Sequence, residues 1–420
     1  MDCPPVGAGA TIDPDTFDIP ATDAATVPIQ DAMAHLRCLT QTEAPENFIK
    51  RAEVAPVFAS LEEPEDLEIL AAVDPFAKLL GWIPPDASLK DTLDMLSVDL
   101  VLGFYVTDEN VLYVVTDTDE LTPLAQATVA HEWVHALQQK SFDIDKMGDD
   151  VGDFDFDAAG ALSALVEGDA TYFEEEFTAE YFSRSKRARA IDEELSMATL
   201  SAAELFELEA LLVDQLMPYL YGPDFVESFL ADGGEPPLAD LYADPPTTSA
   251  EILHPALYAA GFEPSDVAMP DVAAALGGAW AETMDGTWGE FSTANMIAAL
   301  GGVRAESELT LVDGWRGDKL TGWQSGPGLT VAIASAWSDE RKANDVRRRL
   351  QSVLDASDVG TAQGDFVEVA PNRYFRVTAT CSETLVLMTS DPAAATALGP
   401  VEAAGSTCDT SGGGSGGPKI

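Results

Sequence analysis

A five-residue pattern in the middle of the chain combines side chains that can bind and activate a metal ion. His131, Glu132 and His135 form an H-E-x-x-H sequence. On a helix, residues four positions apart share one face, so both imidazoles can reach one ion, and the carboxylate between them can reach a water on that ion. The chain has only four histidines, and composition alone would give about 0.003 such patterns. A helix with two surface histidines is the simpler alternative.

Residues 122–139 are expected to form the helix that carries this pattern. The segment is rich in Ala, Leu and Gln, which favour helices. Thr122 can cap its start, and Pro123 suits its first turn. Apolar residues at rough helical spacing predict a buried side, namely Leu124, Val129, Val134 and Leu137. A bound metal ion explains two histidines on one face of a mostly buried helix most simply.

Glu167 is the candidate third ligand. Catalytic zinc sites use three protein ligands, whereas structural sites use four and commonly include cysteine, and this chain has no C-x-x-C pair. Glu167 lies among apolar neighbours within residues 157–182, a predicted helix, and a buried carboxylate needs a partner. Gly168 has no side chain and would let this helix approach the helix with the histidines closely. A solvated helix residue is the alternative for Glu167.

At these residues the chain resembles the gluzincin metallopeptidases, the thermolysin-like zincins. The sequences HEWVH and ALVEGDAT carry the resemblance. It implies an α+β fold with a mainly helical zincin-like core and a small edge sheet. It also implies zinc on His131, His135 and Glu167, with Glu132 as general base. The spacing is longer than in the best known members, because 31 residues separate His135 from Glu167.

Asp169 and Thr171, which follow Glu167 on the same predicted helix, are candidates to orient a histidine ligand without binding the metal themselves. Asp169 points away from Glu167 on a helix, and it either orients a histidine or caps a neighbouring turn. Many gluzincins carry an aspartate four residues after the glutamate ligand, where this chain has Thr171. We therefore keep Asp169 and Thr171 as the two candidates.

The chain is also similar to a poorly characterised group of exported bacterial proteins, over about residues 95–355. This similarity rests on HEWVHALQQ, LVEGDATYFE, YGPDFVESFLADGG and DPPTTSAEILHPALY. It supports the fold more than any substrate.

His254 is the other histidine expected to matter for the chemistry. Thr248 and Glu251 form a capping-box pattern that predicts a short helix, and the proline after His254 is expected to end it. In gluzincins a histidine or tyrosine stabilises the oxyanion of the tetrahedral intermediate. By that resemblance His254 is the candidate, with Tyr258 and Tyr221 behind it. A capping or packing histidine is the alternative.

The charge balance limits the partners. The net charge is -51, from 73 acidic and 22 basic residues. Such a surface repels phosphate, which excludes nucleic acid as a natural partner and argues against anionic membranes. The simplest account is a strongly hydrated, halophilic surface, because salt screens its self-repulsion. A cationic substrate is the functional alternative.

The four cysteines fall into two couples, one near each end of the chain. We expect the disulfides Cys3–Cys38 and Cys381–Cys408, and therefore an oxidising compartment. No apolar run is long enough to span a membrane, and the first residues do not form a signal peptide. The expected location is extracellular or in the cell envelope, after export with a leader that this chain lacks.

The pattern of elements predicts four regions. Residues 1–95 are an N-terminal extended and helical region, and residues 96–300 are the zincin-like metallopeptidase domain. Residues 301–410 form a smaller α+β domain, and residues 411–420 are a Gly/Ser-rich tail. In the smaller domain, strands are expected at 319–323, 329–336, 366–370, 373–380 and 384–388, around a helix at 338–354.

Within the metallopeptidase domain, a hairpin is expected just before the metal helix, with strands at 100–106 and 110–116. Residues 183–300 are expected to be mainly helical, with breaks at Gly222-Pro223 and Pro245-Pro246. Residues 143–157 hold seven aspartates. They do not match an EF-hand, because Met147 and Phe154 stand at ligand positions. A solvated acidic loop is the favoured interpretation, and irregular Ca²⁺ binding is the alternative.

These observations favour an exported, zinc-dependent peptidase that acts on a peptide or protein substrate. Glu132 would take a proton from the attacking water and pass it to the leaving amine. An envelope binding protein that keeps the fold and metal without turnover is one alternative, and a metal-stabilised structural protein is another. Glu132 weighs against both, because a purely structural site has no use for a base.

Overall fold

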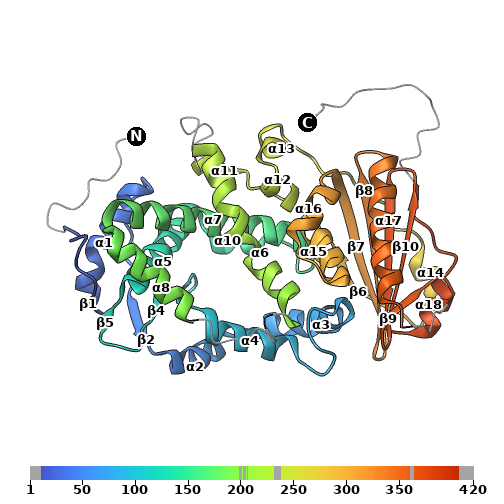
Figure 1. The fold of residues 1–420 in the computed structure, drawn as a ribbon, viewed down its shortest axis with the longest axis horizontal. Helices are drawn as coiled ribbons and strands as arrows, with labels where there is room; N and C mark the ends of the chain where they lie inside the picture. Colours follow the sequence, from blue (N-terminus) through green and yellow to red (C-terminus); the bar gives the residue numbers. More distant parts are fainter. Residues whose placement is uncertain are drawn as a thin grey trace. The chain divides into compact units, whose positions relative to one another are not determined.

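The computed structural model describes residues 11–197, 201, 205, 207–230, 238–359 and 364–405. The chain divides into two compact units, 1–153 with 157–261, and 154–156 with 262–420 (Figure 1). Both units combine helices with β-sheet, so the α+β class is confirmed. The division after Gly261 differs from the expected boundaries: residues 1–95 join the first unit, and residues 262–300 join the second.

Helix α5 (Pro123–Phe142) is the central helix of the first unit. Thr122 caps it by accepting a hydrogen bond from the Ala125 amide, as the sequence predicts. Of its twenty residues, fourteen are buried, because α1 (Asp23–Leu36), α8 (Arg184–Met197) and a small sheet pack around it. The helix that carries His131 and His135 is therefore held from several sides.

That small sheet has the order β2-β4-β3. Strands β3 (Gly103–Val106) and β4 (Val111–Val115) form the predicted antiparallel hairpin. The parallel strand β2 (Glu46–Ile49) was not predicted, because residues 1–95 were expected to be an extended and helical region. Strand β3 lies at the edge and packs on α5. A Cβ on Gly103 would lie 2.6 Å from Thr128 and 3.2 Å from the Glu132 side chain, so only glycine allows this close packing.

Helices α7 (Phe156–Tyr181) and α10 (Glu209–Leu230) cross at two glycines. A Cβ on Gly168 would lie 2.3 Å from the Gly222 carbonyl carbon, and one on Gly222 would lie 2.2 Å from the Ala164 oxygen. The predicted break at Gly222-Pro223 is therefore wrong, because α10 runs through it. Gly168 does permit a close helix contact, but its partner is α10 and not α5.

The remaining elements of the first unit surround these helices. Pro245-Pro246 does separate two helices, as predicted. The elements are β1 (Ile19–Pro20), α2 (Arg51–Leu61), α3 (Pro64–Leu80), α4 (Leu89–Leu100), β5 (Glu120–Leu121), α6 (Ile144–Asp149), α11 (Leu238–Ala243), α12 (Ser249–Leu253) and α13 (Pro255–Ala259).

The second unit contains a six-stranded antiparallel sheet in the order β6-β7-β8-β11-β10-β9. Helix α17 (Glu340–Ser357) packs on β8 to β11, with α15 (Glu290–Gly301) and α16 (Glu306–Val312) beside it. The other face is covered by an apolar cluster around α14 (Val272–Leu276) and α18 (Pro392–Leu398). The strands are β6 (Ala281–Gly286), β7 (Trp315–Ser325), β8 (Gly328–Trp337), β9 (Val367–Ala370), β10 (Arg373–Thr380) and β11 (Glu383–Thr389).

The five predicted strands and the predicted helix of this unit are confirmed, whereas β6 was not expected. Cys38 and Cys381 are both disulfide-bonded. Their predicted partners, Cys3 and Cys408, lie outside the described residues, as does the tail, so the pairing stays a prediction. Among the described residues, no helix is both long and apolar enough to cross a membrane.

Candidate metal centre

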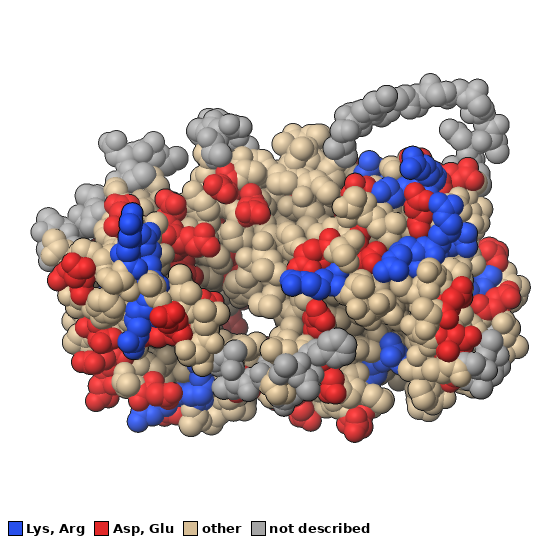
Figure 2. All heavy atoms as spheres, in the orientation of Figure 1, with Lys and Arg blue, Asp and Glu red and all other residues tan. Residues whose placement is uncertain are grey.

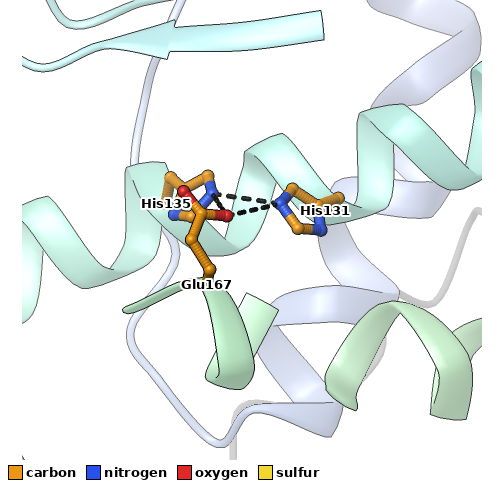
Figure 3. A group of neighbouring side chains, drawn as sticks. All are labelled: His131, His135 and Glu167. Atoms are coloured by element: carbon orange, nitrogen blue, oxygen red, sulfur yellow. Dashed lines mark hydrogen bonds and ion pairs between the residues drawn. The ribbon is translucent and has the colours of Figure 1, made fainter. Parts of the chain in front are cut away.

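Helices α5 and α7 bring three ligand atoms together (Figure 3). His131 Nε2 lies 3.2 Å from both His135 Nε2 and Glu167 Oε2, and His135 Nε2 lies 3.3 Å from Glu167 Oε2. Zinc bonds of about 2.0–2.1 Å at tetrahedral angles separate neighbouring ligand atoms by about 3.3–3.4 Å. The three predicted ligands therefore fit three corners of a zinc tetrahedron. Among the described residues, no other acidic, histidine or cysteine group converges in this way.

The far side of the His135 ring is fixed by Gln138. The Gln138 Oε1 atom lies 2.8 Å from His135 Nδ1. The amide orientation follows from its other contacts, because Gln138 Nε2 donates to the Val166 carbonyl at 2.9 Å and to Asp169 at 3.0 Å. His135 Nδ1 must then carry the proton, which leaves a lone pair on Nε2, facing the site.

The far side of the His131 ring contacts Glu174. The distance from His131 Nδ1 to Glu174 Oε2 is 3.2 Å. Glu174 was not predicted, although it lies seven residues after Glu167, two helical turns on and therefore on the same face of α7. The carboxylate orients His131 in the way usual for histidine ligands of metals.

Asp169 and Thr171, the two candidates to orient a histidine ligand, differ in their contacts. Asp169 is fully buried and accepts hydrogen bonds from Gln138, Tyr242 and Arg37. It therefore reaches His135 only through Gln138. The Thr171 hydroxyl is buried and makes no hydrogen bond among the described residues. Glu174, about one helical turn after Thr171 on α7, contacts the His131 ring.

Charge in the site favours cation binding. At His131 and His135, burial alone would lower the pKa, but the Glu167 carboxylate and its neighbours outweigh it and raise the pKa of both. At Glu167, burial would raise the pKa, but the two imidazoles outweigh it and hold it far below the usual range. Glu167 and the neighbouring carboxylates thus stabilise positive charge at the place where the three atoms meet.

Glu132 is buried beside this cluster and is only 6% exposed. Burial raises its pKa, while His131 and His135 oppose the rise. A carboxylate with a raised pKa is a better proton acceptor than one in water. The Gly103 contact described above sets how closely the edge strand approaches this side chain.

Tyr219 on α10 also reaches the centre, which the sequence did not predict. Its ring stacks on His131 with centroids 6.2 Å apart, and the charges of Glu167 and Glu132 act on its hydroxyl. Burial, followed by the charges of Glu167 and Glu132, raises its pKa far above the usual range. The hydroxyl therefore stays protonated and can donate. The sequence signal that could have indicated Tyr219 is Gly222, because its lack of a side chain lets this turn of α10 lie close to α7.

Of the residues predicted for the oxyanion, His254 and Tyr258 lie on other elements, whereas Tyr221 lies on α10. His254 is half-buried at the junction of α12 and α13, at a helix end as expected. Its catalytic role stays a prediction. The Tyr258 hydroxyl donates to the Asp244 carbonyl at 2.7 Å, and its ring packs on Phe225 and Phe229. Tyr221 is half-buried on α10.

The acidic segment 143–157 contains the short helix α6 and is not wholly a loop. Asp145 accepts a hydrogen bond from Thr107, and the buried Asp157 accepts one from the Ser249 amide. Asp155, in the part that belongs to the second unit, accepts one from Thr287. Several of its aspartates thus have structural partners.

Comparisons with known proteins add one match. A family model described as a domain of unknown function (DUF8575) matches residues 279–398, within the second unit. The matched segment does not include the metal centre. No curated protein and no solved structure matches the chain.

Proposed function

We propose that the protein is a zinc-dependent peptidase whose catalytic centre lies between α5, α7 and α10. The observation that carries the proposal is the triangle of His131 Nε2, His135 Nε2 and Glu167 Oε2 with sides of 3.2–3.3 Å. Two imidazoles and one carboxylate are a donor set that suits zinc, and three protein ligands leave a position open for reaction. A zinc ion held there supplies Lewis-acid polarisation of the scissile carbonyl and a lower pKa for water.

The chain's own residues supply the proton transfer and the orientation. Glu132 follows His131 on α5 and is placed to accept a proton from the attacking water and to pass it to the leaving amine. Glu174 and Gln138 hold the two imidazoles in the tautomer that presents Nε2. Tyr219 donates a hydrogen bond to the oxygen of the scissile carbonyl, which becomes negatively charged during the reaction. The sequence had predicted His254 for this role.

The edge strand β3 gives the centre a place for an extended peptide. Its outer edge has no partner strand among the described residues, and the strand packs on α5 at Gly103. Backbone groups of such an edge can pair with a substrate strand. This arrangement favours a peptide over a small molecule as the substrate.

The second candidate is an exported binding protein that keeps the metal and turns over no peptide. One experiment separates the two. Protein purified without chelator should contain about one zinc per chain, and it should cleave members of a broad peptide library. Zinc that stays at full occupancy in a His135→Ala, Glu167→Ala double variant would refute the metal site. Full zinc without any cleavage would favour the binding protein.

A further inference from the structure

A line of buried contacts leads from His135 to the end of the N-terminal helix. Gln138 connects His135 to Asp169, as described above. Asp169 in turn pairs with Arg37, which follows α1, and Arg37 Nε lies 2.7 Å from Asp169 Oδ1. The Arg37 and Asp169 side chains are only 5% and 0% exposed. Arg37 lies 98 positions before His135 in the sequence. Three successive contacts nevertheless connect it to the His135 ring.

Aromatic rings from three helices surround the Arg37 guanidinium. Its central carbon lies 5.7 Å from the Phe142 ring, 5.4 Å from the Phe173 ring and 6.0 Å from the Tyr242 ring. These rings belong to α5, α7 and α11, and Phe142 stacks on Tyr242 with centroids 4.1 Å apart. A cation is attracted to ring faces at these distances. The cage holds Arg37 in one place and so fixes where Asp169 meets it.

The Asp169 carboxylate needs this cation. A buried carboxylate without a partner is strongly unfavourable, so its remaining donors would have to move to satisfy it. Those donors are Tyr242, at 2.6 Å, and the Gln138 amide. A shift of the Gln138 amide moves the oxygen that fixes His135 Nδ1. The orientation of a metal ligand is therefore sensitive to the presence of Arg37.

We infer that Arg37 is a positioning residue for His135, acting through Asp169 and Gln138, and that it raises the zinc affinity of the centre. The inference rests on the proposed metal site. It also makes the N-terminal helix part of the metal-binding unit. The opposing interpretation is a buried ion pair that only stabilises the fold.

The test is the zinc dissociation constant of the full chain, measured by competition with a chromogenic chelator. Arg37→Met keeps the apolar stem and removes the charge and the donors. Loss of partners outside the ligand set typically weakens metal binding 10- to 100-fold, so we expect a weakening of about 10-fold or more. Arg376→Met is the matched control. Arg376 is also buried and pairs with Glu402, in the second unit, and its loss should leave zinc affinity unchanged.

A double-mutant cycle separates positioning from general destabilisation. Gln138→Leu removes the link between Asp169 and His135. If Arg37 acts through that link, adding Arg37→Met to Gln138→Leu should change zinc affinity little. The double variant should bind zinc no more than about 2-fold more weakly than Gln138→Leu alone, because the effects of coupled residues are not additive. Independent, additive losses would overturn the inference.

Asp169→Asn decides the matter if Arg37→Met does not fold, since it keeps the size of the side chain and removes its charge. It should also weaken zinc binding about 10-fold. Unchanged zinc affinity in either folded variant would contradict the role of Arg37. A wild-type protein that binds no zinc would overturn the proposed function itself, so the two failures are distinguishable.

Discussion

Tyr219 is the side chain that most changes the expected chemistry at the residue scale. Its hydroxyl stays protonated beside Glu167 and Glu132, so Tyr219→Phe removes one donor and little else. Losing one donor to an oxyanion costs about 10²- to 10³-fold in kcat, and we expect that loss with little change in KM or zinc content. Tyr258→Phe is the control, because that hydroxyl bonds the Asp244 carbonyl. Equal kcat for Tyr219→Phe and wild type would exclude this role.

Lys186 offers a test of pH dependence. It is 1% exposed, and its ammonium donates to Gln126 at 2.7 Å. Burial lowers its pKa from 10.5 to about 8, although Asp13 and Asp18 oppose the shift. Between these pH values the unfolded chain binds more protons than the folded protein, so this lysine makes stability rise with pH across that window.

Lys186→Met removes that contribution. The free energy of unfolding of wild type, minus that of the variant, should grow by about 1–3 kcal/mol between pH 7 and pH 10. Urea denaturation at the two pH values measures it. A difference that stays constant, or that shrinks as pH rises, would show that Lys186 is not desolvated in the folded protein.

Single residues were predictable where one short pattern defines the chemistry. His131, Glu132 and His135 stand within five residues, and Glu167 stands out as an acid among apolar neighbours. Glu174 and Tyr219 were missed for different reasons. Glu174 is one of three consecutive glutamates on an otherwise ordinary helix, whereas Tyr219 depends on a helix crossing that no local pattern encodes.

At the scale of elements, the crossing of α7 and α10 is the feature on which the centre depends most. The two helices meet at Gly168 and Gly222, and Tyr219 lies one turn before Gly222. An added methyl group at Gly222 would lie 2.2 Å from a backbone oxygen of α7. Gly222→Ala must therefore push α10 away and should cost about 1–3 kcal/mol in unfolding free energy, measured by denaturant titration.

Gly160→Ala on α7 is the matched control, because a Cβ there meets nothing within 4 Å. It should be neutral or raise stability by up to about 1 kcal/mol, since alanine favours helices over glycine. Gly222→Ala should also lower peptide cleavage through the displaced Tyr219. Equal stability of the two variants would contradict the close crossing.

The elements that the sequence predicted well have strong local signals. Helix α5 has a capping threonine and a proline in its first turn, and the strands of the second unit alternate or run apolar between clear turns. Strand β2 is only four residues long and pairs with a strand far along the chain. Helix α10 continues through Gly222-Pro223 because packing against α7 outweighs the local preference. Tertiary contacts decided both cases.

At the scale of the whole molecule, the excess of acidic over basic side chains is the feature that most affects stability. Figure 2 shows acidic side chains spread over the visible surface of both units, with fewer basic ones among them. A net charge of -51 destabilises the folded protein by self-repulsion. The Debye length falls from about 10 Å at 0.1 M salt to about 3 Å at 1 M, so the melting temperature should rise over that range of NaCl. A flat or falling melting temperature would contradict the halophilic interpretation.

The central claim is that Glu132 acts as a general base beside zinc held by His131, His135 and Glu167. The most direct measurement is peptide cleavage by zinc-loaded Glu132→Gln, compared with wild type at equal zinc content. The substitution keeps the size of the side chain and removes the proton acceptor. Cleavage should fall by about 10²- to 10⁴-fold while zinc stays bound. A variant that binds one zinc and cleaves as fast as wild type would contradict the account.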